Sequence, residues 1–390
     1  MSAYSGDQER AIRVMRLVND WTKSKLLSQE QRDQIAPELQ VDLRRTNKFL
    51  RVTMFVFGFL ILQAFTGLLA IGFAAGGEEA ASVLCAITAG LSYFVANLLV
   101  TRYNLYRFGI EEAAAVASVG FAMAAAALLA GSVSNFRGDA PVVAALIVGA
   151  VAALAMFLRF GYVYAAIGSM LFAAALPFVP GDSDMIHRLL SALILVVIFA
   201  VARSIRNQFG REFPGDSYAI IEAAAWAAIY LVINLQLTSW LSHPEDRTPF
   251  YWATYVATWV LPVIGLWVAV LDRHRLLLDV SALMAIATLM TNKEYLGAAR
   301  QPYDPIAFGV LLIAIAMGLR RWLASGEDGS RDGFIAERIL ESEKERLGVV
   351  GTFSVVHQGP VASHPQPEQP PPPAIGGGGR AGGAGATGSF

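Results

Sequence analysis

The sequence predicts an all-α protein: a polytopic integral membrane helical bundle of about ten transmembrane helices with a small N-terminal cytoplasmic α-hairpin. Of the 390 residues, 55% are hydrophobic and 16% are charged, whereas about 25% are charged in soluble domains. Apolar runs of about 17 to 25 residues, long enough to cross a bilayer, recur from Leu50 onward. Arginine and lysine are concentrated in every second loop, which is the pattern of a multi-pass membrane protein.

Residues 1–48 precede the first apolar run and are predicted to form the cytoplasmic hairpin. Its first helix should extend from about Asp7 to Lys25. The apolar side chains of this helix recur at helical spacing: Ile12, Met15, Val18 and Trp21 or Leu26.

The second helix of the hairpin should begin at Ser28, which forms an S-x-x-Q capping box with Gln31. Its apolar stripe continues through Ile35, Leu39 and Leu43. A piece this small cannot fold alone, so we expect it to dock through Trp21, with Ser28 and Gln31 shaping the turn. The expected docking surfaces are the arginine-rich loops 203–216 and 272–276, a helix at 331–347, or a second copy. The acidic residues Glu30, Asp33 and Glu38 would meet those arginines.

At the hairpin the chain resembles the membrane protein family described as domain of unknown function 2157. The matching residues are Trp21, Leu27, Ser28, Glu30, Gln31 and Ile35, followed by a multi-span region. Lys25 stands at a position where the family has glycine, which would supply a positive-φ helix stop. The resemblance covers about 40 residues and implies no known activity.

Residues 49–324 are predicted to form the bundle, because backbone groups in hydrocarbon must be satisfied within a helix. The ten predicted spans are 50–74, 80–100, 112–132, 140–158, 162–179, 187–202, 218–240, 251–271, 276–291 and 304–323; eight spans is the alternative. The basic N-terminal segment places both termini in the cytoplasm, in a bacterial-type inner membrane.

Abundant Ala and Gly indicate close helix packing, with Gly149 and Ala153 as an alternative dimer face. Pro262 and Gly265 should kink the eighth span, either as geometry alone or beside a binding cavity.

The C-terminal region contains two further segments. Residues 325–350 are predicted to hold a cytoplasmic amphipathic helix, at 331–347. Residues 351–390 are rich in proline and glycine and are expected to be disordered. Cys85 is the only cysteine and the five histidines have no ligand spacing, so neither a metal site nor a cofactor is expected.

Ionisable and polar residues inside the spans are the candidate binding or cavity residues, because burying such groups in a membrane is costly. They are Glu222, Asp279, Asn97, Tyr93 and Gln63, with Asn234 and Gln236 toward the outer end of the seventh span. Each also has a structural interpretation. Asp279 could pair with Arg275, and Glu222 with Arg203 or Arg159. Gln63 and Asn97 could hold helices together. Glu111 and Glu112 begin a span and should favour the helix dipole.

These candidates favour a non-enzymatic membrane scaffold or sensor with cytoplasmic interaction elements. No charge falls at the predicted midplane, which argues against ion-coupled transport. One alternative is a passive or lipid-type transporter or flippase with a cytoplasm-facing cavity around Glu222 and Asp279. The second is a membrane enzyme, such as a lipid-linked sugar transferase acting at Glu78 and Glu79. No catalytic motif is present. Expected partners are the lipid bilayer and a cytoplasmic protein or a second copy, but no nucleic acid.

Overall fold

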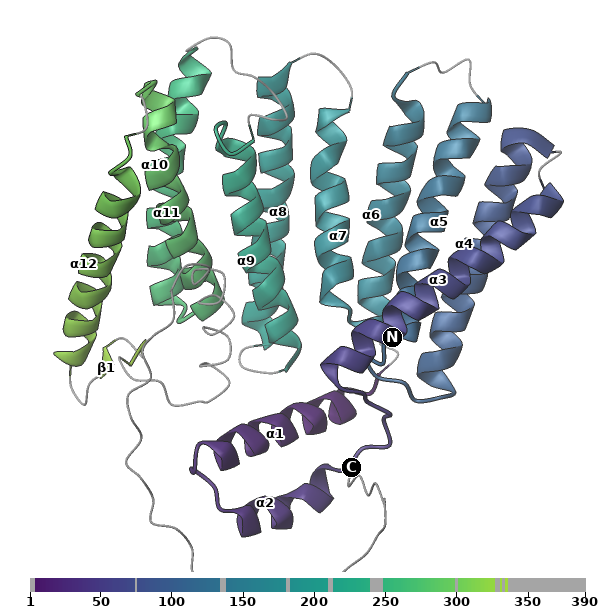
Figure 1. Cartoon of the computed structure of the whole chain (residues 1–390), viewed down its shortest axis with the longest axis horizontal. Coiled ribbons are helices and arrows are strands. Elements are labelled where there is room, and N and C mark those ends of the chain that lie inside the picture. Colours follow the sequence, from purple (N-terminus) through teal and green to yellow (C-terminus); the bar gives the residue numbers. More distant parts are fainter. Residues whose placement is uncertain are drawn as a thin grey trace, which may run out of the picture. The chain divides into compact units, whose positions relative to one another are not determined.

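The structure is a computed structural model that describes residues 4–73, 76–133, 138–179, 183–209, 213–238, 248–298, 301–326, 330–331 and 334–335. The chain divides into two compact units, Met1–Glu341 and Ser342–Phe390. All described residues belong to the first unit, and they are predominantly helical (Figure 1). The predicted class, an all-α polytopic membrane bundle, is therefore confirmed.

Every predicted span corresponds to a helix whose bounds differ from the prediction by a few residues. The helices are α3 (Lys48–Phe73), α4 (Gly77–Thr101), α5 (Ile110–Val133), α6 (Ala140–Phe160), α7 (Val163–Ala175), α8 (Asp184–Phe209), α9 (Phe213–Ile233), α10 (Pro249–Leu271), α11 (Arg275–Leu296) and α12 (Asp304–Ala324). A 3₁₀ turn, η3 (Leu176–Phe178), extends α7. Within the described residues, eight helices are long and apolar enough to cross a membrane: α3 to α6 and α8 to α11. α7 is apolar but shorter.

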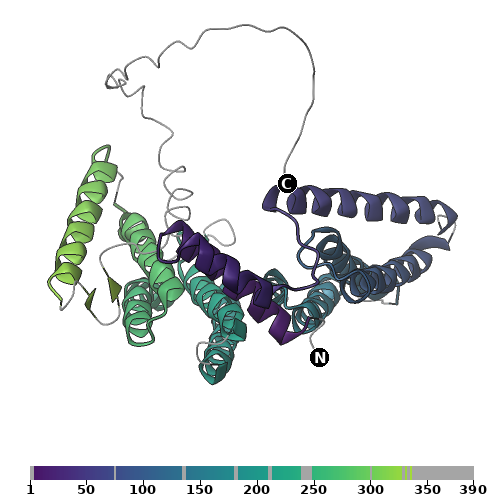
Figure 2. The ribbon, with the colours of Figure 1, turned by 90° about the horizontal axis from the view of Figure 1, so that it is seen from below.

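The predicted hairpin consists of α1 (Gly6–Lys23), α2 (Gln29–Ile35) and a 3₁₀ turn, η1 (Ala36–Leu39). Both halves of the expected capping box are present, because Ser28 accepts from the Gln31 amide and Gln31 from the Ser28 amide. Arg32 donates to Asn19 at 2.9 Å and so connects α2 to α1. Figure 2 shows the hairpin, in purple, crossing the ends of the membrane helices. We call this side of the bundle the hairpin end and the opposite side the far end.

The turn after α1 has Lys25 at a position where helix stops usually have glycine. Lys25 has φ 61°, a left-handed conformation. The Lys25 amide donates to the Thr22 carbonyl, and the Leu26 amide donates to the Trp21 carbonyl. These two bonds define a Schellman helix stop, whose left-handed residue is usually glycine. The turn is therefore as tight as a glycine would make it, although lysine adopts this conformation at an energetic cost.

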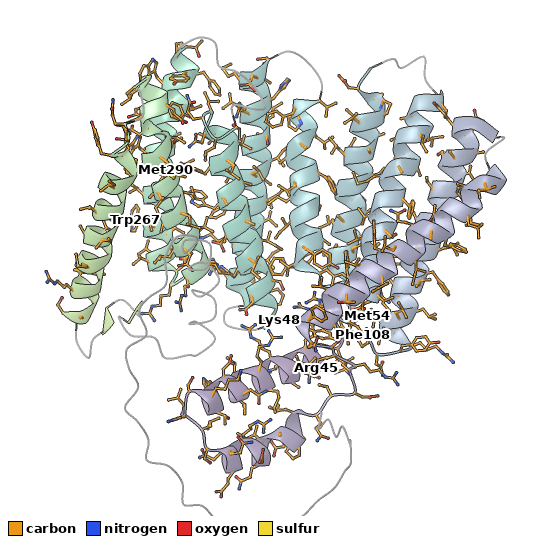
Figure 3. All side chains as sticks on the ribbon, viewed as in Figure 1. Arg45, Lys48, Met54, Phe108, Trp267 and Met290 are labelled. Carbon is orange, nitrogen blue, oxygen red and sulfur yellow. The ribbon has the colours of Figure 1, made fainter. Side chains whose placement is uncertain are left out.

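The membrane helices pack mainly against their neighbours in sequence, α4 with α5, α5 with α6, α6 with α7, α8 with α9, and α10 with α11. Helix α3 packs on α5, and α9 packs on α11. Large apolar side chains cover the outside. Trp267 on α10 and Met290 on α11, labelled in Figure 3, are 67% and 54% exposed. An apolar exterior of this extent is what lipid contact requires.

Two core clusters of buried apolar side chains hold the helices together. The first core cluster contains Ala96 and Val100 of α4, Ala114 and Ala115 of α5, Met156, Phe157 and Phe160 of α6, Tyr162, Ala165 and Ala166 near the start of α7, and the hairpin-segment residues Tyr4, Ile12 and Leu43. The second core cluster lies among α7 to α11 and contains Met170, Leu195, Trp226, Ile229, Tyr230, Leu277 and Met284.

Small residues allow helices to approach within both halves of the bundle. A Cβ at Gly149 would lie 2.7 Å from the sulfur of Met123, and Ala153 is buried. The Gly149–Ala153 face is therefore used inside the chain, which removes the basis for a dimer through it. A Cβ at Gly265 would lie 2.2 Å from Ser281 Oγ, so this glycine permits close contact between α10 and α11.

The prediction of an amphipathic helix at 331–347 is wrong for the first residues of that range. Ser330–Arg331 (β1) and Phe334–Ile335 (β2) form a short antiparallel pair, in which Arg331 lies opposite Phe334. The intervening residues in the sequence are Asp and Gly, the dipeptide that favours two-residue hairpins. This local turn preference prevails over the helical spacing of the apolar residues. The rest of that predicted helix and the tail at 351–390 lie outside the described residues.

Candidate functional site

The hairpin docks through residues other than the predicted anchor. Trp21 is 38% exposed, whereas Ile12 and Val18 of α1 are 3% and 2% exposed. Tyr4, which precedes α1, is 5% exposed and packs edge-to-face on Tyr106 at a ring distance of 4.9 Å. The prediction that Trp21 supplies the apolar contact is therefore wrong. Ser28 and Gln31 are exposed and serve the capping box.

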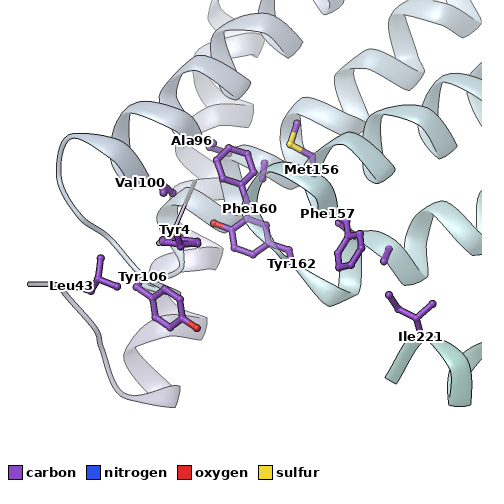
Figure 4. Close-up of a cluster of buried hydrophobic side chains, with 14 of the residues drawn as sticks. Tyr4, Leu43, Ala96, Val100, Tyr106, Met156, Phe157, Phe160, Tyr162 and Ile221 are labelled. Atoms are coloured by element: carbon purple, nitrogen blue, oxygen red, sulfur yellow. The ribbon is translucent and has the colours of Figure 1, made fainter. Parts of the chain in front are cut away.

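The docking surface is the segment between α4 and α5. The Tyr4 hydroxyl donates to the Leu105 carbonyl at 3.1 Å, and Figure 4 shows Tyr4 beside Tyr106 with Tyr162 nearby. Main chain also pairs with main chain: the Arg44 amide donates to Asn104, and the Tyr106 amide donates to Arg44. The hairpin is thus joined to the bundle both before α1 and after η1.

A second contact joins the hairpin to α9. Arg13 of α1 forms an ion pair with Asp216 in the first turn of α9. The expected loop 203–216 thus takes part, but with the charges reversed, because the hairpin supplies the cation. The hairpin therefore contacts α9 as well as the segment between α4 and α5.

Glu222 lies in a buried ionic cluster at the hairpin end. Its side chain is fully buried, and Arg206 Nε of α8 approaches Glu222 Oε2 to 2.7 Å. Arg206 also lies 3.1 Å from Asp272, to which Arg203 pairs at 2.9 Å. The partner of Glu222 is thus Arg206, not Arg203 or Arg159, because Arg206 lies one turn further along α8. The cluster holds two cations and two anions, so their charges balance.

His274 completes this ionic cluster as the N-cap of α11. Its Nδ1 accepts the Leu277 amide at 2.8 Å, while Nε2 lies 4.0 Å from Glu222 Oε2. Since Nδ1 accepts a hydrogen bond, Nε2 carries the proton of the neutral ring and points toward the carboxylate. Burial and the nearby charge of Arg206 lower the pKa of His274 below its ordinary value. The neutral form is therefore the one that suits this site.

The other predicted cavity residues do not converge on Glu222. Asn97 of α4 accepts two hydrogen bonds from Arg159 of α6, at 3.2 and 2.8 Å. Tyr93, one turn earlier, is 40% exposed and contacts Phe160. Gln63 of α3 and Asp279 of α11 are exposed. The prediction of a shared polar cavity around Glu222 and Asp279 is therefore wrong, because the Glu222 side chain is fully buried whereas Asp279 lies on the bundle surface.

Glu111 and Glu112 have specific partners at the start of α5. Glu111 accepts the amides of Phe108 and Gly109 at 2.6 and 3.1 Å, and so caps the helix. Glu112 pairs with Arg51 of α3. Gly109 has φ +114°, and a Cβ there would lie 2.2 Å from the Arg51 carbonyl. This glycine thus allows the α4–α5 segment to contact α3.

A cavity of about 290 Å³ lies between α5, α6 and α7. Its lining is almost entirely apolar and includes Val119, Met123, Ala153, Met156, Gly168 and Phe172. Tyr162 and Tyr164 line it at the start of α7. Met156, Tyr162 and Ala165 also belong to the first core cluster, so the cavity borders the side chains on which the hairpin docks.

A polar network at the far end contains Asn234, one of the polar residues singled out in the seventh predicted span, together with partners that were not predicted. Asn234, at the end of α9, is fully buried and donates to Tyr230 at 3.0 Å and to Thr291 at 3.2 Å. Tyr230 and Thr288 share a hydrogen bond of 2.8 Å. The Tyr295 hydroxyl accepts the Leu235 amide at 2.8 Å. The signal in the sequence was helical spacing: Tyr230 and Asn234 are four residues apart, as are Thr291 and Tyr295.

Arg188 is a second missed residue at the far end. It is 1% exposed and lies near the start of α8. It donates to Asp184, to the Val232 carbonyl and to Thr238, each at 2.8 Å. This buried arginine connects α8 to the end of α9, a structural role that its position at the edge of the predicted span 187–202 did not indicate.

Within the described ranges, no group of three or more His, Cys, Asp or Glu side chains is placed to hold a metal ion. No protein-family model, curated protein or solved structure matches the chain. The resemblance to domain of unknown function 2157 therefore stays a prediction.

Proposed function

We propose that this protein is a non-enzymatic sensor or scaffold of the cytoplasmic membrane whose N-terminal hairpin acts as the cytoplasmic interaction element. The observation that carries this proposal is the composition of the first core cluster. Tyr4, Ile12 and Leu43 from the hairpin segment pack in the same cluster as Ala96, Met156 and Phe160 of the membrane helices. A rearrangement of these helices therefore changes the surface on which the hairpin docks.

The chemistry of the hairpin supports the same proposal. Its docking side uses buried apolar groups, whereas α2 has no buried residue and exposes Glu30 and Asp33. Exposed carboxylates on a docked element can steer a basic cytoplasmic partner to it by charge complementarity. The arginine and lysine residues of this segment support a cytoplasmic location for it.

The test is a charge reversal across the contact between hairpin and α9. Arg13→Asp should loosen the hairpin, and Asp216→Arg in the same chain should restore docking. Hydrogen exchange of residues 6–23 in the reconstituted protein measures docking, and complementation of the deleted gene measures function. Function should be lost in the single variant and regained in the double variant. If the single variant undocks the hairpin and function is unchanged, the hairpin is not the functional element.

A passive lipid transporter is the second candidate function, because an apolar cavity lies between α5, α6 and α7. Its test is reconstitution into liposomes that carry fluorescent phospholipids in both leaflets. A soluble quencher should then bleach more than the outer leaflet if lipids cross through the protein. Bleaching equal to that of protein-free liposomes removes this candidate.

A further inference from the structure

We propose that the cavity between α5, α6 and α7 binds one acyl chain of a bilayer phospholipid, and that the bound chain stabilises hairpin docking. The second part rests on the proposed function, whereas the first does not.

The shape of the cavity suits an acyl chain. Along α5 its lining extends from Ala115 to Met123, and along α7 from Tyr162 to Phe172. At about 1.5 Å per residue these stretches span roughly 12 and 15 Å. The cavity is thus elongated along helices that cross the bilayer, the direction in which lipid chains lie. Its volume of about 290 Å³ is at the small end for ligand sites, which fits one chain and not a whole lipid.

The rim of the cavity gives access from lipid. Gly120 of α5 is exposed and Tyr164 of α7 is 40% exposed, and both line the cavity. The helix surface around them is exposed to the bilayer in a protein of this class. Space for a side chain exists at this rim, because a Cβ at Gly120 would meet no atom within 4 Å. A chain can therefore enter sideways, without passing through the bundle.

Polar groups stand where the glycerol and headgroup of such a lipid would lie. Tyr164 interacts electrostatically with Glu112, Glu111 and Arg51, which lie at the hairpin end of α5 and α3. The Arg51 side chain is 35% exposed. This arrangement, apolar along the helices and polar at the helix ends, matches the polarity of a phospholipid with its headgroup at the hairpin end.

The link to the hairpin runs through aromatic contacts. Tyr162 lines the cavity and stacks on Phe160 at a ring distance of 5.5 Å and on Tyr164 at 5.3 Å. Tyr4 belongs to the same core cluster as Tyr162 and Phe160, and Figure 4 shows the three rings close together. An acyl chain that fills the cavity packs against Met156 and Tyr162, which line the cavity and also belong to the first core cluster. Those side chains then hold Tyr4, and with it the hairpin.

The test uses glycine-to-leucine variants that fill the cavity. At Gly168 an added Cβ makes only an ordinary contact with Phe172, and at Gly120 it meets nothing. Gly90→Leu and Gly67→Leu are matched controls, because these positions are exposed on α4 and α3, outside the cavity lining, and also have free space. Since leucine favours helix more than glycine does, all four variants should fold.

The first measurement is crosslinking by a phosphatidylcholine that carries a diazirine in one acyl chain, in nanodiscs. Crosslinks should map to lining residues of α5 and α7. Their yield should fall about tenfold in Gly168→Leu, as a loss of about 1.4 kcal/mol of binding free energy gives, and should persist in both controls. Equal yields in Gly168→Leu and Gly90→Leu, or crosslinks spread evenly over the bundle exterior, would overturn the binding site.

The second measurement is hydrogen exchange of residues 6–23. Removing lipid with detergent should raise exchange in the unmodified protein and in Gly90→Leu, but not in Gly168→Leu, whose leucine replaces the chain. If lipid crosslinks to the cavity but the exchange rate of the hairpin is the same with and without lipid, the link to docking is wrong and the binding site is still supported. Fast hairpin exchange in lipid as well as in detergent would instead contradict the proposed function.

Discussion

The two core clusters of the bundle are held together by different interactions. The first consists of apolar side chains, mostly alanines and aromatic rings of α4 to α7, and is completed by Tyr4, Ile12 and Leu43. Around the second, α8 to α11 are joined by ion pairs of Arg206 and Asp272 at the hairpin end and by hydrogen bonds of Asn234 at the far end. In lipid the hydrophobic effect does not drive helices together, so close packing and polar contacts remain. Both halves combine the two, but the hairpin docks on the packed side chains of the first half, whereas buried ion pairs and hydrogen bonds join the helices of the second half at both ends.

Because of this difference, the two halves should respond to different changes, one to packing and the other to protonation. The first core depends on a segment outside the membrane and on a cavity that can be filled or empty. The second is fixed by charged and polar partners whose removal leaves a buried group unpaired. A signal that changes packing should therefore act on the first half, whereas a change in protonation should act on the second.

The largest effect should follow from breaking the buried ion pair of the second half. Arg206→Leu leaves the fully buried Glu222 without its partner and should destabilise the protein by about 3 to 5 kcal/mol. The double variant Arg206→Leu with Glu222→Leu should recover most of this loss, because neither charge is then buried alone. Melting temperature and abundance in membranes measure the effect. If the double variant is no more stable than the single one, the pair does not account for the loss.

Breaking the first core should release the hairpin and leave the second half unchanged. Tyr4→Ala removes a ring that is 5% exposed and should weaken docking by about 3 kcal/mol. Amides of residues 6–23 should then exchange roughly a hundredfold faster, while those of α9 and α11 keep their rates. Trp21→Ala is the control, since its ring is 38% exposed and its loss should cost less than 1 kcal/mol. If the amides of residues 6–23 exchange faster in the Trp21 variant than in the Tyr4 variant, Trp21 and not Tyr4 is the main docking residue.

Acidification should weaken the second half through His274. Burial and Arg206 lower its pKa in the folded protein. The stabilising contribution of the neutral ring is therefore complete above its ordinary pKa of 6.5 and is lost as the pH falls from there through the lower folded-state value. Protonation also removes the Nδ1 acceptor of the Leu277 amide, a cap of about 1 kcal/mol. The carboxylates of Glu222 and Asp272 attract the protonated ring and so reduce this loss of stability, whereas Arg206 repels it and increases the loss.

The measurement is the melting temperature between pH 7.5 and 5.5. It should fall more in the unmodified protein than in His274→Asn, which keeps a capping oxygen but does not titrate. Equal slopes for the two proteins would exclude His274 as the group responsible.

The smallest effect concerns the hairpin turn. Lys25→Gly places the favoured residue at a position with φ 61° and should stabilise the hairpin by up to about 1 kcal/mol. Exchange of residues 6–23 should slow, while the melting temperature of the bundle should hardly change. A faster exchange would show that the left-handed turn is not maintained in solution.

The helices could be predicted from sequence because length and apolar composition determine them in a membrane. The ten predicted spans all correspond to helices, and the capping box of Ser28 is present as predicted. The predicted helix at 331–347 was wrong at its start because its apolar spacing was weighed without the Asp-Gly turn. Trp21 was preferred over Tyr4 because residue size and helical spacing favoured it, whereas Tyr4 precedes the helix and has no periodic signal.

Partners across helices were less predictable than the helices. Glu222 was identified as a buried group, but the choice between Arg203 and Arg206 depends on helix rotation, which sequence alone does not determine. Asp279 was grouped with Glu222 because both lie at the same depth, yet the two side chains differ in burial. Depth follows from chain position, while direction around the helix axis follows from packing. Asn234 was singled out, but its partners Tyr230 and Thr291 were missed because Tyr and Thr in the spans were not considered together with Asn as polar groups.

The pairing of an early segment with late ones has a consequence for synthesis at the ribosome. Arg13 meets Asp216, which is translated about 200 residues later, a delay of roughly 10 to 40 seconds at 5–20 residues per second. Tyr4 waits about half as long for Leu105 and Tyr106. During this interval Tyr4 and Ile12 lack the membrane-helix side chains that cover them in the first core cluster. The nascent hairpin is therefore open to chaperones and proteases, and its docking can be complete only after the start of α9 has been synthesised.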